Sequence, residues 1–173
     1  HQISSGGHGM PVDFDDLVQV ASRLILLGVH NLNFVTPDHF WPHIRALAQA
    51  LRAKGHTIPL LFNGSGYVWP ERVDDYAEHM DIFMPDFKFA SADIAAACMG
   101  DARYPDLAMA AITKMVAHRG FLDPWDLSGL RPATRGVLVR HLVLPGEVEN
   151  SLEALRRLRK EFGPLLPLSL MSQ

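Results

Sequence analysis

With 173 residues, the chain has the length of one domain that can bury a sizeable core. Its 48% hydrophobic and 20% charged residues are typical of an ordered globular protein and exclude the disordered and collagen-like classes. The net charge of −3 and the scattered Lys and Arg argue against a nucleic-acid-binding surface or a polybasic membrane-binding patch.

The cysteine content and the lengths of the apolar stretches indicate the cellular setting. Cys98 is the single cysteine, within an Ala-rich helical segment, so this chain alone cannot form a disulfide framework or a cysteine metal cage. No apolar stretch approaches the length of a membrane span, and no signal peptide opens the chain. We therefore expect a soluble protein of the reducing cytoplasm.

Helical and strand patterns alternate along the chain. After a polar, glycine-rich loop, the periodicity of the apolar residues predicts, in chain order, a helix over 11–27, a strand over 29–35, a helix over 38–54, a strand over 58–62, a helix over 70–80, a strand over 81–88, helices over 91–99 and 106–118, a strand over 136–144, a helix over 149–162 and a strand over 166–172. The stretch 121–135 is a predicted loop, rich in Pro, Gly and Asp. Asp38 is the expected N-cap of the second helix, and Gly55 its expected end.

This alternation predicts an α/β fold in one domain, residues 1–173. Parallel strands need crossover connections, which the helices supply, and no β-hairpin signal is present. The helix over 11–27 has no strand before it in the sequence given, so we expect another element to complete the sheet. An open seam at that place predicts self-association of the chain.

Polar residues follow the ends of several predicted strands. The strand over 81–88 ends in Asp86 and Lys88, which the two-residue period of a strand places on one side. The other strands end in Thr36 to His39, Asn63 to Gly66, Arg140-His141 and Ser172-Gln173. Because ligands bind at the carboxyl ends of parallel strands, we expect these residues to form one site.

Three other interpretations remain open at this point. His39 and His43 stand four apart on a predicted helix, as paired metal ligands do. Lys88 could form a Schiff base, which would make the chain a metal- or Schiff-base-dependent barrel lyase using His39, His43, Asp86 and Lys88. Ser65 stands in a partial nucleophile-elbow pattern, with Phe62 where the first glycine would be. A barrel without catalysis, acting as a binding module, is the non-enzymatic alternative.

Several stretches together resemble the radical S-adenosylmethionine (SAM) enzymes of the pyruvate formate-lyase activating enzyme type. They are NFVTPDHF (33–40), LFNGSGY (61–67), DIFMPDFK (81–88), VRHLVLPG (139–146) and SLMSQ (169–173). The resemblance covers nearly the whole chain and implies a partial parallel (β/α) barrel with strands two to six present and the first strand missing. It also implies an enzyme that cleaves SAM reductively with a [4Fe-4S] cluster, forming a 5′-deoxyadenosyl radical that activates a glycyl radical enzyme.

The resemblance assigns roles to individual residues. It implies that Arg140 binds the SAM carboxylate, that Asn63, Met84 and Asp86 surround a monovalent cation, and that Lys88 contacts cofactor and substrate. With Asp86 and Lys88 as the catalytic pair, the expected cofactor-binding residues are Thr36, Asp38, Asn63, Ser65, Arg140 and Gln173.

The chain also departs from the family pattern. Thr36 to His39 stands where the family has Gly-Gly-Glu, so Asp38 would replace the acid that holds the SAM amino group, and Asn63 replaces an Asp. The C-x-x-x-C-x-x-C loop that binds the cluster is not in this sequence; HQISSGGHG resembles the stretch that follows it. As given, the chain is therefore expected to bind no cluster and to cleave no SAM.

Overall fold

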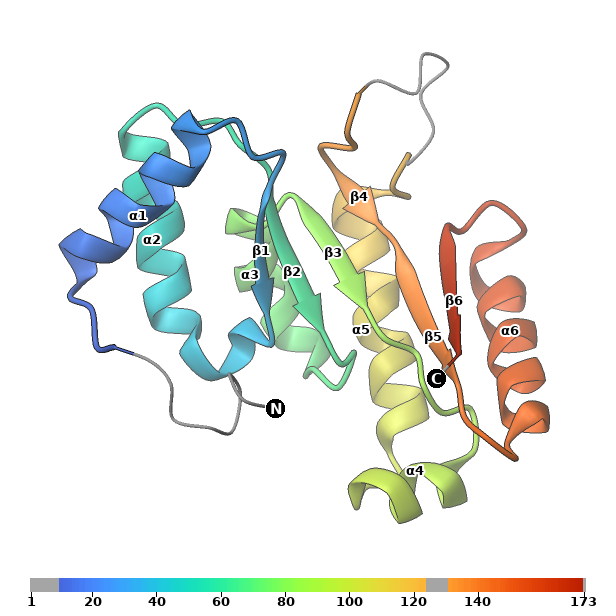
Figure 1. Ribbon diagram of the computed structural model, residues 1–173. Coiled ribbons are helices and arrows are strands. Elements are labelled where there is room, and N and C mark those ends of the chain that lie inside the picture. Colours follow the sequence, from blue (N-terminus) through green and yellow to red (C-terminus); the bar gives the residue numbers. More distant parts are fainter. Residues whose placement is uncertain (1–9, 124–130, 173) are drawn as a thin grey trace.

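The computed structural model describes residues 10–123 and 131–172. Most of the N-terminal loop, part of the loop predicted over 121–135, and Gln173 therefore lie outside the described residues. Helices and strands alternate as the sequence predicts (Figure 1): α1 (Phe14–Leu26), β1 (Leu32–Val35), the 3-10 helix η1 (Pro37–Phe40), α2 (Trp41–Ala53), β2 (Leu60–Gly64), the 3-10 helix η2 (Pro70–Arg72), α3 (Val73–His79), β3 (Ile82–Pro85), α4 (Ala92–Met99), α5 (Tyr104–Arg119), β4 (Gly136–Val137), β5 (Val139–Val143), α6 (Val148–Phe162) and β6 (Leu168–Ser172).

All described strand pairs are parallel, and neighbouring strands follow the order of the chain. One sheet has the order β1-β2-β3-β4, and a second sheet consists of β5 and β6. The two sheets meet just past β3, where the Phe87 N–H donates to the Arg140 carbonyl (2.8 Å). The expected α/β fold with a parallel sheet is confirmed, and all the strands end at the lower edge of Figure 1.

The two faces of the sheet differ in how they are covered. Side chains at alternate positions, such as Phe62, Phe83 and Val139, are buried in the main core together with residues of the helices. α3 and α5 lie behind the strands in Figure 1, while α6 flanks β5 and β6. On the opposite face, Leu61, Ile82 and Leu122 form a separate small cluster near the amino ends of the strands. Toward the carboxyl ends of the strands, this face carries the polar residue Asn63 beside Met84 and Val35.

Two sequence predictions about local structure are wrong. The strand predicted over 136–144 is two strands, because β4 pairs with β3 while β5 pairs with β6, and the chain changes neighbours at Leu138. Asp38 does not cap a helix: it lies inside η1, and α2 begins at Trp41 without a side-chain cap. Gly55 does follow the end of α2 with a positive φ of 82°, as predicted for a helix end.

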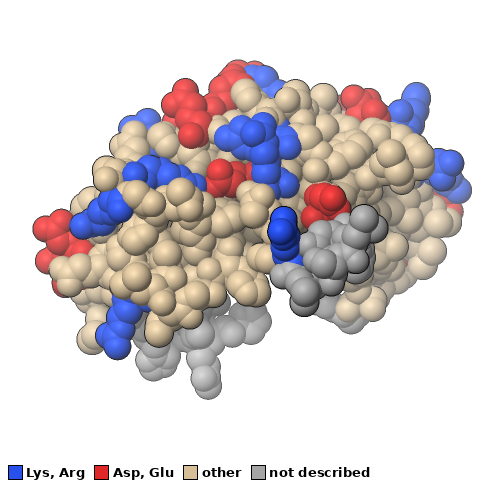
Figure 2. Space-filling view, turned by 90° about the horizontal axis from the view of Figure 1, so that it is seen from above, with Lys and Arg blue, Asp and Glu red and all other residues tan. Residues whose placement is uncertain are grey.

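The face at which the strands begin carries mixed charge. Figure 2 looks down on this end and shows Lys and Arg side chains interspersed with Asp and Glu. One such pair joins Arg52, at the end of α2, to Asp81, just before β3 (2.7 Å). No helix within 10–123 or 131–172 is long and apolar enough to cross a membrane.

Candidate functional site

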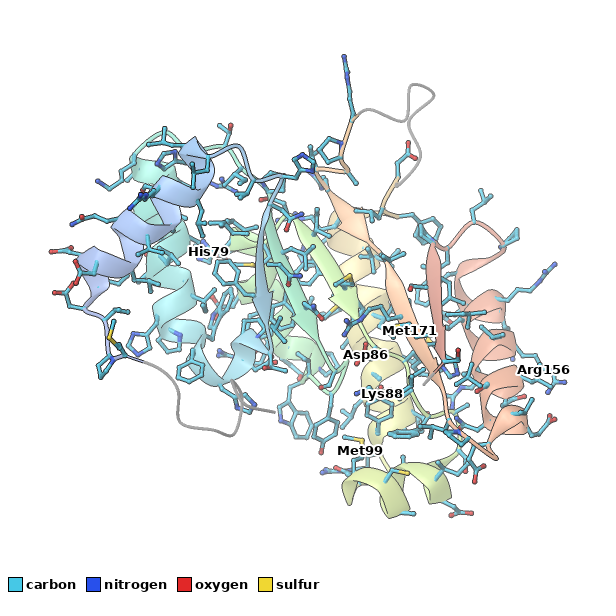
Figure 3. All side chains as sticks on the ribbon, in the orientation of Figure 1. His79, Asp86, Lys88, Met99, Arg156 and Met171 are labelled. Carbon is cyan, nitrogen blue, oxygen red and sulfur yellow. The ribbon has the colours of Figure 1, made fainter. Side chains whose placement is uncertain are left out.

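Three charged side chains meet at the carboxyl end of β3. Asp86 is 6% exposed, and its Oδ2 lies 3.1 Å from the Lys88 Nζ, while its Oδ1 lies 2.6 Å from the Arg140 Nη2. Figure 3 shows Asp86 and Lys88 just past the end of β3, in the middle of the carboxyl edge. We call Asp86, Lys88 and Arg140 the charged trio.

The pairing between strands explains why these side chains meet. Alternate residues of a strand face opposite sides, so Met84, Asp86 and Lys88 follow Ile82 on the face without helices. Arg140 faces the same side because the parallel bridge joins it directly to Asp86. One cationic side chain therefore comes from β5 and the other from the end of β3.

Asn63 belongs to the same face. It pairs in register with Met84, one position before Pro85, and its side chain is 7% exposed. Asn63, Met84 and Asp86, the three expected cation ligands, thus lie on adjacent strands at the same edge. Side-chain oxygens of Asn and Asp suit a monovalent or divalent cation.

Two atoms of the charged trio are incompletely satisfied. Among the residues that the structure describes, the buried Nε of Arg140 has no hydrogen-bond acceptor, and the Asp86 Oδ1 accepts no aligned N–H although Arg140 is close. Buried polar atoms of this kind usually have a partner, so each needs an explanation. The Arg140 side chain as a whole keeps an exposed fraction of 23%, so a ligand carboxylate can approach the exposed part of its guanidinium.

The turn after β2 contacts the charged trio. A Cβ added to Gly66 (φ +76°) would lie 2.0 Å from the Asp86 carbonyl oxygen, so only glycine allows this approach. Ser65 is half-buried in the same turn, and its Oγ accepts the N–H of Tyr67 (3.3 Å). Ser65 therefore lies near the trio, and its carbonyl oxygen lies 3.0 Å from the Tyr104 hydroxyl.

Thr36 and Asp38 follow β1 at the same edge. The Thr36 N–H donates to the Asn63 carbonyl (2.7 Å), and Thr36 has a left-handed conformation (φ 48°), which is unusual for a β-branched residue. Asp38 interacts with Tyr76 and Arg72, and burial, opposed in part by its hydrogen bonds, raises the pKa of its carboxyl group. The structure therefore brings Thr36 next to Asn63, whereas Asp38 interacts with groups of η2 and α3.

The remaining predicted residues lie elsewhere. His141 points away from Arg140 to the helix side of the sheet, fully buried, and its Nδ1 donates to the Phe87 carbonyl (2.5 Å). His39 and His43 are exposed. The described residues contain one group of three possible metal ligands, Asp75, Glu78 and His79, to which neither of these histidines belongs. Gln173 lies outside the described residues.

Sequence reasoning missed two residues that support the site, Tyr104 and Asn150. Both are buried, and both hydrogen-bond to the main chain around Lys88. Burial raises the pKa of the Tyr104 hydroxyl, so it stays protonated as a hydrogen-bond donor. In the sequence, each of the two is a polar residue within an apolar helical pattern. Its hydrogen-bond partner, the main chain around Lys88, is distant in the chain, so the sequence pattern does not identify it.

The arrangement has two cationic groups and one anionic group at a solvent-accessible edge. Lys88 and Arg140 retain exposed fractions of 35% and 23%. Since the buried Asp86 is already paired with both cations, the partly exposed Lys88 and Arg140 complement a ligand that carries a carboxylate. The chain matches no protein-family model and no curated protein.

Proposed function

We propose that the chain is the SAM-binding part of a radical SAM enzyme of the pyruvate formate-lyase activating enzyme type. The observation that carries the proposal is the convergence of Asp86, Lys88 and Arg140 at one edge, with Met84 on the same strand, β3, and Asn63 on the neighbouring β2. These residues come from three of the five stretches on which the resemblance rests. Because these residues lie on separate strands, they could have faced opposite sides of the sheet, and that arrangement would have contradicted the proposal.

The strand order supports the finer assignment of the fold as a partial (β/α) barrel. The strands follow one another in chain order and all pairs are parallel. With right-handed crossovers, this order puts the helices on one face, as in a barrel, whereas a doubly wound sheet reverses direction. β1 would then correspond to the second barrel strand.

The charged trio fits the methionine portion of SAM. Arg140 would bind the carboxylate through the exposed part of its guanidinium, and Lys88 would add a second positive charge. Asp86 holds both cations in place and balances one of them. Thr36 adjoins Asn63 at the place where the family holds the SAM amino group, and its strained main chain is consistent with a binding role.

The residues of this chain do not fit a [4Fe-4S] cluster. Cys98 is the single cysteine, and it lies exposed on α4, whereas a cluster of this type takes three thiolates from one short loop. Reductive cleavage of SAM therefore requires cysteines from sequence outside this chain. In a protein that has them, the products would be methionine and a 5′-deoxyadenosyl radical, and the acceptor would be a glycine of a partner enzyme or another substrate.

The test uses the protein made from its complete reading frame. That reading frame should encode C-x-x-x-C-x-x-C shortly before His1. Anaerobic reconstitution with iron and sulfide, followed by a reductant and SAM, should give cluster absorbance and 5′-deoxyadenosine. If all three cysteines are present and neither signal forms, the proposal is wrong.

The single cysteine also favours a second candidate, a barrel that binds a SAM-like ligand without cleaving it. A natural start codon near His1 with no upstream cysteines, together with SAM binding but no 5′-deoxyadenosine, would select this candidate. The lyase alternative has less support, because the Lys88 Nζ that would form the Schiff base is already held in an ion pair with Asp86 (3.1 Å). It would require borohydride trapping at Lys88 or zinc binding that His39→Ala abolishes.

A further inference from the structure

The main chain at Lys88 has left the sheet, yet both of its polar groups are paired. Its N–H donates to the hydroxyl of Tyr104 on α5 (2.9 Å), and its carbonyl accepts from the amide nitrogen of Asn150 on α6 (3.1 Å). Tyr104 is fully buried and Asn150 is 5% exposed. Two helices that are far apart in the sequence therefore each supply one side chain to the same residue.

Asn150 fixes the segment that follows as well. Its amide oxygen accepts the N–H groups of Ala90 (2.9 Å) and Ser91 (3.2 Å), so one side chain makes three main-chain hydrogen bonds. Ser91 in turn caps α4, accepting the N–H of Ile94 (3.4 Å). Arg157, also on α6, donates to the Ala90 carbonyl (3.1 Å), so two side chains of α6 hold the path from Lys88 to α4.

Tyr104 joins this segment to the turn after β2. Its hydroxyl lies within donor distance of the Ser65 carbonyl (3.0 Å) and the Asp86 carbonyl (3.1 Å) while it accepts the Lys88 N–H. The ring packs between Tyr67 and Phe89, with ring centroids 6.2 Å and 5.3 Å away. Removing the hydroxyl alone would keep this ring packing and lose the three polar contacts.

A lysine on a free loop samples many orientations, and fixing its charge for a ligand costs conformational entropy. Here the main chain of Lys88 is fixed from both sides, and Asp86 holds its ammonium at 3.1 Å while the side chain stays partly exposed. Preorganisation of this kind increases affinity because less freedom is lost on binding.

We propose that Tyr104 and Asn150 are positioning residues that hold the Lys88 ammonium ready for the carboxylate of the bound ligand. The naming of that ligand as SAM rests on the proposed function. The positioning of Lys88 rests on the hydrogen bonds alone and can be tested separately.

The first test measures amide hydrogen exchange at Lys88 by NMR in the complete protein. Tyr104→Phe should accelerate exchange at Lys88 by at least roughly tenfold, since its N–H loses its acceptor. Tyr67→Phe is the matched control, because its hydroxyl donates to Asp101 instead. Unchanged exchange at Lys88 in Tyr104→Phe would overturn the positioning role, whatever the ligand is.

The second test compares SAM with 5′-methylthioadenosine, which lacks the amino acid portion. Tyr104→Phe and Asn150→Ala should weaken SAM binding roughly fivefold to tenfold, the value of one hydrogen bond, and leave 5′-methylthioadenosine binding unchanged. In a Lys88→Met background, Tyr104→Phe should cause no further loss of SAM affinity, because the two act through one group. Equal losses for both ligands, or additive losses in the double variant, would reduce both residues to a general structural role and overturn the proposal. Failure of the unmodified protein to bind SAM would instead contradict the proposed function, and the exchange test would still decide the positioning role.

Discussion

The left-handed conformation of Thr36 is a local strain at the carboxyl edge. A β-branched residue in this region costs about 1–2 kcal/mol, and Asn tolerates it better. Thr36→Asn should therefore increase the free energy of unfolding by about 0.5–1 kcal/mol, allowing for the lost hydroxyl bond to the Val35 carbonyl. Urea unfolding of the variant measures this.

Thr57→Asn is the control for this change, because Thr57 is exposed like Thr36 but has no positive φ. Thr36 is the one non-glycine residue with positive φ in the described ranges. Thr57→Asn should leave stability unchanged within error. A destabilised Thr36→Asn protein would show that the strain is absent in solution.

The half-buried carboxyl group of Asp38 makes stability depend on pH. Burial raises the pKa of this carboxyl group, although its hydrogen bonds oppose the rise. At pH values just above the ordinary aspartate pKa, the folded state therefore holds a proton that the unfolded state has released. Stability therefore falls as pH rises through this window, and the loss persists at neutral pH. Asp38→Asn should stabilise the protein at neutral pH, and the gain should vanish below the ordinary aspartate pKa. Urea unfolding across pH tests this; a gain that is equal at acid and neutral pH would refute it.

At the scale of the elements, the turn after β2 is tied sterically to the end of β3. Gly66→Ala would put a Cβ 2.0 Å from the Asp86 carbonyl oxygen and strain a positive φ, so we expect a loss of about 3 kcal/mol or more. Gly55→Ala has the same kind of φ (82°) with open space around the added Cβ and should cost about 1 kcal/mol. Equal losses in the two variants would contradict the close approach of turn and strand.

The sequence predicted the helices and strands better than it predicted which strands pair with each other. Apolar periodicity identified the helices and strands because it reports which positions are buried. It placed one strand over 136–144, since both β4 and β5 are apolar and only their pairing partners differ. The cap expected at Asp38 was wrong because a 3-10 helix comes before α2.

The same limit applies to the candidate site. The alternation of side chains at Asp86 and Lys88 predicted their meeting from local sequence alone. The contacts of Lys88 with Tyr104 and Asn150 span 16 and 62 residues, and no local pattern indicates them. His141 follows Arg140 directly, yet it faces the helices, as the two-residue period of a strand requires.

At the scale of the whole molecule, β1 is an edge strand of the described four-stranded sheet. An apolar groove of about 310 Å³ runs between α1 and β1, lined by residues that include Leu17, Leu24 and Phe34. Val35 at the end of β1 is 69% exposed. An unpaired apolar edge of this kind favours association with another strand.

We therefore expect light scattering to show association of this chain that increases with concentration. Val35→Lys should reduce it, because a charge on an edge strand opposes pairing. Val148→Lys, at a similarly exposed position on α6, should not. A monomer at high concentration would contradict an open edge.

The proposed site requires that the charged trio binds a carboxylate, which calorimetry of the complete protein with SAM measures directly. Arg140→Ala should weaken SAM binding by about 1.5–3 kcal/mol, roughly tenfold to a hundredfold or more, because a charged hydrogen-bond donor is lost. Arg156→Ala, an exposed arginine of α6 paired with Glu149, should bind SAM like the unmodified protein. Equal SAM affinity of the Arg140→Ala and unmodified proteins would contradict a carboxylate site at the charged trio.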